Sequence, residues 1–148
     1  MKKLVLGVVA LLMAWTVQAQ EPVPMVQATY EQITATLAKE NGTNTAQVKQ
    51  ELTTIIYPKF DFTRMTALAV GRPWREATPE QKTALTEAFR DLMTDIYFNT
   101  MLRFKTATVS VSPQALIAND GKEATVKTQA KLPNDTTSVM IDYVLYNT

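Results

Sequence analysis

The chain is 148 residues long, a length typical of one domain, and it contains no cysteine and no histidine. These absences exclude a Ser-His-Asp triad, a Cys-His pair and the usual zinc sites, so we expect no catalytic residue and no metal centre. Without Lys2 and Lys3, which we expect to be removed, the 15 basic residues become 13 against 14 acidic ones. This near-neutral balance excludes the basic face that nucleic-acid binding requires.

The N-terminal residues have the pattern of a secretory signal peptide. Two lysines precede an apolar segment, Leu4 to Trp15, that is too short to cross the ~30 Å core of a bilayer. Val17-Gln18-Ala19 then fits the small-x-small rule for cleavage. We therefore expect a cleaved signal peptide at residues 1–19, one mature domain at residues 20–148 and a periplasmic location. An uncleaved N-terminal anchor is the alternative.

Two helices are predicted at the start of the mature chain. Apolar residues spaced four, three and four apart predict a helix over residues 25–39, after an extended lead at Pro22 and Pro24. A second helix is predicted over residues 45–57, where Pro58 ends it.

A short third helix is predicted between Asp61 and Gly71. Asp61 can cap its start, and a glycine with positive φ is typical of a helix end. Because Asp61 lies between two phenylalanines, a buried carboxylate with a raised pKa is the alternative to a cap. The inner face of this helix is expected to carry Phe62, Met65, Leu68 and Ala69.

The clearest local signal is Thr78-Pro79-Glu80-Gln81, which predicts a capping box with proline at the first helical position. It starts a long helix over residues 79–104. The apolar arc of this helix covers more than half of its circumference, which is wider than an ordinary surface helix needs. We therefore expect more than one neighbouring element to cover it.

The period of the apolar residues changes from 3.6 to 2 after Lys105, which predicts strands. Asn119-Asp120-Gly121 is expected to turn a hairpin. The last strand, residues 137–147, is apolar on both faces except at Asp142, so we expect it to be central and the domain to continue beyond Thr148. The order predicts an α+β fold with N-terminal helices packed on one face of an antiparallel β-meander.

Three arginines, Arg64, Arg72 and Arg75, cluster in the sequence near Trp74. Guanidinium groups bind phosphate well, so this cluster could hold a phosphate group. Pairing on the surface with nearby glutamates is the interpretation that the sequence favours.

Residues 57–97 resemble the MlaC family, also called the toluene-tolerance family. The resemblance rests on Pro58, Phe60-Asp61-Phe62, Met65, Val70-Gly71, Trp74, Ala77-Thr78, Gln81, Phe89 and Tyr97. It implies a monomeric, non-catalytic periplasmic carrier of phospholipid, with the lipid as cargo and no cofactor. It also implies partners at both membranes: an outer-membrane lipoprotein–porin complex and an inner-membrane ABC transporter complex, between which lipid moves to maintain outer-membrane asymmetry.

The family fold implies an apolar cavity between the helices and the sheet. We expect eleven apolar and aromatic residues to line it: Phe62, Met65, Leu68, Phe89, Met93, Tyr97, Met101, Val109, Val126, Ile141 and Tyr143. A periplasmic adaptor with a solid core is one alternative. A lipid hydrolase is another, but without histidine it would need an Asp or Ser–Lys centre, and no such arrangement is visible.

Overall fold

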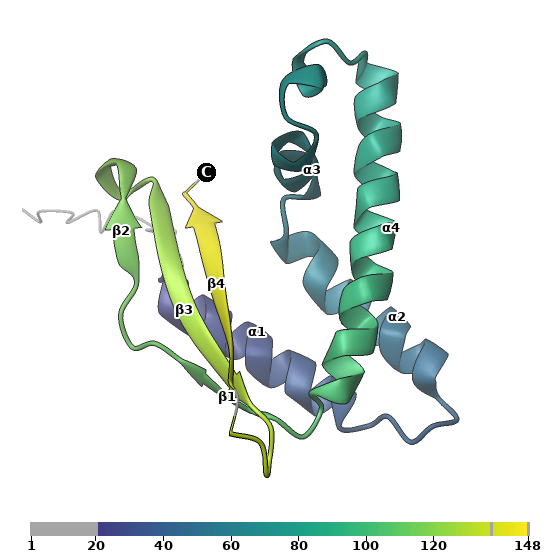
Figure 1. The fold of residues 1–148 in the computed structure, drawn as a ribbon, viewed down its shortest axis with the longest axis vertical. Helices are drawn as coiled ribbons and strands as arrows, with labels where there is room; N and C mark the ends of the chain where they lie inside the picture. The colour runs from purple at the N-terminus through teal and green to yellow at the C-terminus, as the bar shows by residue number, and fades with distance from the viewer. Residues whose placement is uncertain (1–20, 137, 148) are drawn as a thin grey trace, which may run out of the picture.

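The computed structural model describes residues 21–136 and 138–147, so the predicted signal peptide lies outside the described residues. Helices come first and strands second, which confirms the α+β prediction (Figure 1). The helices are α1 (Pro22–Leu37), α2 (Thr45–Ile56), α3 (Phe62–Val70) and α4 (Pro79–Arg103), with short 3₁₀ turns η1 (Tyr57–Lys59), η2 (Arg72–Arg75) and η3 (Asn119–Gly121). The strands are β1 (Thr108–Val111), β2 (Leu116–Ala118), β3 (Glu123–Lys131) and β4 (Ser138–Tyr146).

The antiparallel sheet is built around β3. One edge of β3 pairs along its whole length with β4, from Glu123 opposite Tyr146 to Lys131 opposite Ser138. β1 and β2 pair with different parts of β3, β1 with residues 128–131 and β2 with residues 123–125. They therefore act as one interrupted strand, and the sheet is a meander three strands wide.

β3 is the central strand among the described residues, and the expectation that the last strand is also central stays a prediction. Among the described residues, β4 pairs with β3 alone. Val144 and Met140 are exposed on the face of β4 opposite to Tyr143. A run of apolar residues predicts burial on both faces, but it does not reveal whether a neighbouring strand is present.

Helix α1 covers the inner face of the sheet, which we define as the face of Val126 and Thr128 in β3. Both residues are buried, as is Val26 of α1. Helix α1 begins three residues earlier than predicted, with Pro22 and Pro24 in its first turn rather than in an extended lead. Proline fits there because the first N–H groups of a helix have no acceptor within it.

A second core cluster joins α1, α2 and α4. It consists of Leu37, Val48, Leu52 and Phe98, with Met101 packed against it. This cluster fixes the C-terminal half of α4 beside α1, close to the point where α4 leads into β1.

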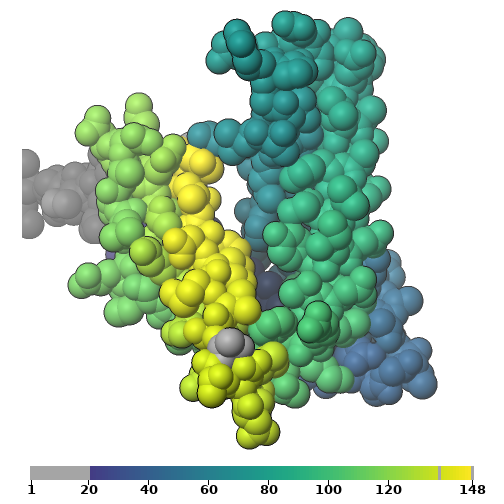
Figure 2. All heavy atoms as spheres, in the orientation of Figure 1, coloured from purple at the N-terminus to yellow at the C-terminus, as the bar shows by residue number. Residues whose placement is uncertain are grey.

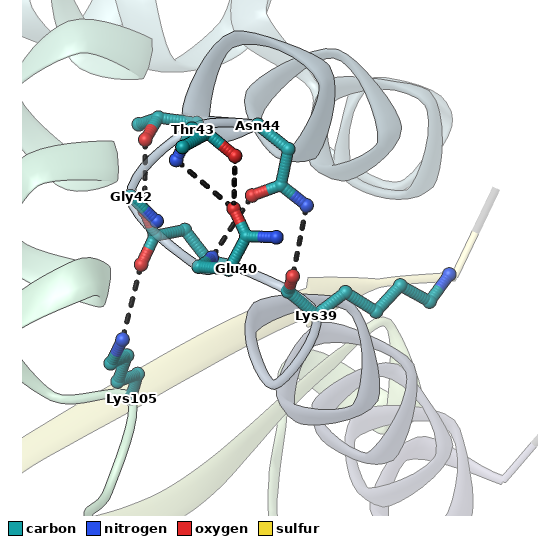
Figure 3. Close-up of polar contacts among 8 residues, drawn as sticks. Lys39, Glu40, Gly42, Thr43, Asn44 and Lys105 are labelled. Atoms are coloured by element: carbon teal, nitrogen blue, oxygen red, sulfur yellow. Dashed lines mark hydrogen bonds and ion pairs between the residues drawn. The ribbon is translucent and has the colours of Figure 1, made fainter.

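Glu40 ties this closed end of the molecule together (Figure 3). Its carboxylate accepts hydrogen bonds from Thr45 Oγ1 at 2.8 Å, from the Gly42 N–H at 2.8 Å and from Lys105 Nζ at 3.1 Å. These bonds, with that from Thr45 the largest cause, hold the pKa of Glu40 below its ordinary value. The α1–α2 turn is thereby attached to the α4–β1 connection.

The local signals around α3 and α4 are confirmed. Asp61 accepts a hydrogen bond from the Arg64 N–H at 2.9 Å and is exposed, so it is a helix cap rather than a buried carboxylate. Gly71 has φ 72° and ψ −138°, a conformation that a side chain would strain. The Thr78–Gln81 capping box forms in both directions, at 3.2 and 2.9 Å.

The α3–α4 pair stands apart from β4. A hollow separates the yellow β4 from the teal α3 and α4 in the space-filling view (Figure 2). The apolar arc of α4 is only partly covered, because Leu85, Leu92, Ile96 and Tyr97 remain exposed. The expectation that more than one element covers the arc is confirmed, since α3 packs on α4 and residues of α1 and α2 surround Phe98. Among these residues, no helix is long and apolar enough to cross a membrane.

Replacing Thr78 by alanine should lower the free energy of unfolding by about 1 kcal/mol, because the N–H of Gln81 loses its acceptor. Urea denaturation measures this loss. Thr83→Ala is the matched control, since the Thr83 hydroxyl only bonds back to the Pro79 carbonyl, and a change within about 0.5 kcal/mol is expected. Equal losses in the two variants would contradict the capping role.

Candidate functional site

Five aromatic side chains connect the helices with the sheet across the floor of the cleft. Neighbouring ring centroids lie 5.5 Å apart for Tyr57–Phe62, 6.1 Å for Phe62–Phe60, 6.5 Å for Phe60–Tyr143 and 5.9 Å for Tyr143–Tyr30. We call this set the aromatic bridge. Three of the four contacts are edge-to-face, a geometry that stabilises aromatic pairs by about 0.5–1.5 kcal/mol each beyond area burial.

A small polar network lies at the sheet end of the aromatic bridge. The hydroxyls of Tyr30 and Tyr143 are 2.7 Å apart, and Tyr30 also contacts Thr128 Oγ1 at 3.4 Å. The Thr128 hydroxyl donates to the Ile141 carbonyl at 2.8 Å. Burial raises the pKa of Tyr143, and the hydrogen bond with Tyr30 raises it further. The bridge is thus fixed by hydrogen bonds as well as by ring packing.

The four predicted sheet residues lie on the inner face. The register places Val126 opposite Tyr143, Ile141 opposite Thr128, and Val109 opposite Ala130. Val126 has no exposed surface and belongs to the core beneath α1, whereas Ile141 is 36% exposed. Helix α1 packs mainly on β1 and β3 and touches β4 at Tyr143, so the exposed Ile141 forms the sheet-side wall of the cleft.

Two predicted helix residues face the cleft from the opposite side. Leu68 lies one turn after Arg64, whose guanidinium reaches the ring of Tyr146 on β4, so both side chains lie on the face of α3 that looks towards the sheet. Leu68 is 72% exposed. Tyr97 of α4 is 53% exposed and lies near enough to Tyr143 to influence its pKa.

The remaining predicted residues differ in their surroundings. Phe62 is part of the aromatic bridge, and Met101 packs against the second core cluster. The others are half-buried: Met65, Phe89, Met93 and Val109. The structure thus brings Phe62, Leu68, Tyr97, Ile141 and Tyr143 to the cleft, while Val126 and Met101 serve the core.

Sequence reasoning missed Tyr30 and Phe60, which connect the bridge to α1 and to η1. Tyr30 belongs to the apolar face whose spacing predicts the first helix, together with Val26, Ile33 and Leu37. A hydroxyl on an otherwise apolar helix face requires a polar partner, and that requirement was the available signal. Phe60 precedes the cap of α3, a position that helical periodicity does not assign to any face.

A separate groove of about 530 Å³ lies between the end of α3, η2 and the start of α4. Its walls are Val70, Pro73, Ala77, Ala84 and Leu85, with Glu76 and Gln81 at its edge. It is formed by the helices alone, so it does not involve the sheet or the aromatic bridge. In residues 21–136 and 138–147, no group of acidic side chains is placed to hold a metal ion.

These features define an α+β protein with an open apolar cleft between its helices and its sheet. A solved structure with the same fold is that of a phospholipid-binding protein from Ralstonia solanacearum in complex with a phospholipid, with a TM-score of 0.72 and 27% identity over 85% of this chain and 70% of that chain. The chain belongs to the MlaC family, whose model, described as MlaC protein, matches residues 27–148. A comparison with curated proteins finds no match. The family resemblance predicted from residues 57–97 is confirmed.

Replacing Tyr143 by phenylalanine should lower the free energy of unfolding by about 1 kcal/mol at pH 7, because the hydrogen bond with Tyr30 is lost.

The wild type should also lose stability as the pH rises above the ordinary tyrosine pKa of 10.0, since Tyr143 then ionises in the unfolded chain but not in the folded one. Tyr143→Phe should remove that part of the slope, up to about 1.4 kcal/mol per pH unit. Urea denaturation from pH 7 to 11 measures both effects, and identical slopes would contradict the burial of Tyr143.

Proposed function

We propose that the protein is a non-enzymatic phospholipid carrier that holds acyl chains in the cleft between β4 and the α3–α4 pair. The observation that carries this proposal is the exposure of apolar side chains on both walls, Leu68 and Tyr97 on one side and Ile141 on the other. Membership of the MlaC family and the bound phospholipid of the Ralstonia protein support it.

The energetics of lipid transfer fit an open apolar cleft. A two-chain lipid has about 30 methylenes, each of which gains roughly 0.8 kcal/mol on leaving water, or about 24 kcal/mol in total. A lipid that already lies in a bilayer has this gain, so a carrier needs only to match the bilayer. An open cleft can accept chains of different length.

The location and partners follow from the same proposal. The signal peptide at residues 1–19 would send a single mature domain to the periplasm, where it would act as a monomer. There it would move phospholipid between an outer-membrane lipoprotein–porin complex and an inner-membrane ABC transporter complex, and so help to maintain outer-membrane lipid asymmetry.

Native mass spectrometry of protein purified from the periplasm tests the proposal. Intact phospholipid bound at one molecule per protein is the expected result. Fatty acid or lysolipid accumulating over time would instead indicate a hydrolase. A bare protein mass, with no lipid taken up from vesicles, would indicate an adaptor domain and would overturn the proposal.

A pair of substitutions on β4 locates the lipid. Ile141→Trp should remove most of the lipid uptake, because the indole fills the sheet-side wall of the cleft. Val144→Trp is the matched control: Val144 is also exposed on β4, but its side chain lies on the opposite face of the sheet, so uptake should stay close to that of the wild type. Transfer of labelled phospholipid from vesicles is measured, with circular dichroism to verify folding. Equal uptake by the two variants would place the lipid elsewhere.

A further inference from the structure

Arg64 spans the end of the cleft at which β4 terminates. Its guanidinium carbon lies 3.5 Å from the centroid of the Tyr146 ring, and its Nη2 lies 3.8 Å from Glu123 Oε1. Glu123 and Tyr146 are paired across β3 and β4, so one side chain from α3 contacts both strands. By the register of the two strands, Glu123 and Tyr146 lie on the face of the sheet opposite to Tyr143, so Arg64 joins α3 to the outer-face side chains at the end of β4.

The contacts of Arg64 leave its hydrogen-bonding capacity largely unused. A guanidinium has five N–H donors, and stacking on a ring engages its face rather than these donors. The ion pair with Glu123 is long for a hydrogen bond, and the Arg64 side chain makes no hydrogen bond to any other described residue. Arg64 is about half exposed. A planar, ring-stacked guanidinium with free donors suits a phosphate group.

The helical wall of the cleft begins beside this cation. Leu68 lies one turn further along the same face of α3, whereas Tyr143 of β4 lies on the face of the sheet opposite to Tyr146. A ligand with apolar chains in the cleft would thus place a polar group that projects from this end within reach of Arg64. The order of cation and apolar surface matches the order of phosphate and acyl chains in a phospholipid.

We propose that Arg64 binds the phosphodiester of the lipid, with the guanidinium held in place by the Tyr146 ring and released from Glu123 when the phosphate arrives. This proposal rests on the proposed carrier function and adds the orientation of the lipid. It assigns to Arg64 the phosphate binding that the sequence raised for the whole arginine cluster. Arg64 then distinguishes phospholipids from neutral lipids with the same chains.

The test is competition between two lipids with identical acyl chains. Lipid-free protein is mixed with phosphatidylglycerol vesicles that contain diacylglycerol, and the ratio of the two captured lipids is measured by mass spectrometry. Arg64→Gln should lower the ratio of phosphatidylglycerol to diacylglycerol roughly tenfold, since a charge-assisted hydrogen bond is lost. Arg64→Lys should restore it in part, because the charge remains while the planar donors are lost.

Two controls separate phosphate binding from a structural role. Arg72→Gln removes a nearby exposed arginine and should leave the ratio unchanged. Glu123→Gln removes the ion pair but leaves the phosphate contact, so the ratio should be unchanged or higher. A ratio in Arg64→Gln equal to that of the wild type, or an equal fall in Glu123→Gln, would overturn the inference while lipid capture continues. Failure of every variant, and of the wild type, to capture either lipid would instead overturn the carrier function.

Discussion

The contact of Tyr143 with Phe60 and Tyr30 is the constraint on which the rest of the structure depends. Tyr143 lies on β4, which pairs only with β3 among the described residues, and its two aromatic neighbours come from the helical part of the chain. Without these contacts, β4 would be held mainly by its pairing with β3, and the distance between β4 and the helices would not be set. The hydrogen bond between the hydroxyls of Tyr30 and Tyr143 fixes this position further, because a buried hydroxyl without a partner would destabilise the fold.

The two ends of the cleft are held by different kinds of interaction. Near the α4–β1 connection, the second core cluster and the Glu40–Lys105 ion pair join the elements through burial and several hydrogen bonds. Where β4 terminates, the exposed contacts of Arg64 with Glu123 and Tyr146 bridge α3 and the sheet. Exposed ion pairs typically contribute at most about 1 kcal/mol to stability, so breaking the Arg64–Glu123 pair costs little free energy. The cleft therefore has one end held by burial and several hydrogen bonds and another end held by the contacts of one arginine.

The sequence predicted the parts of the fold that depend on neighbours along the chain. The capping box at Thr78, the cap at Asp61 and the hairpin at Asn119–Gly121 are local, and all of them form. The exposure of the outer face of β4 could not be predicted, because Val144 and Met140 are as apolar as buried residues while they are exposed. Of the residues expected to line a cavity, Phe62 and Tyr143 both contact Phe60 in the aromatic bridge, whereas Val126 packs in the core. Tyr30 and Phe60 were missed since their role depends on contacts distant in sequence.

The most direct test of the account is to cross-link a phospholipid that carries a photoreactive group within one acyl chain, and to identify the labelled residues by peptide mass spectrometry. The account predicts labels on both walls of the cleft, at Ile141 or Tyr143 of β4 and at Leu68 or Tyr97 of the helices. Labels confined to Val144 and Leu116 on the outer face of the sheet, or to the groove beside Val70 and Leu85, would contradict it.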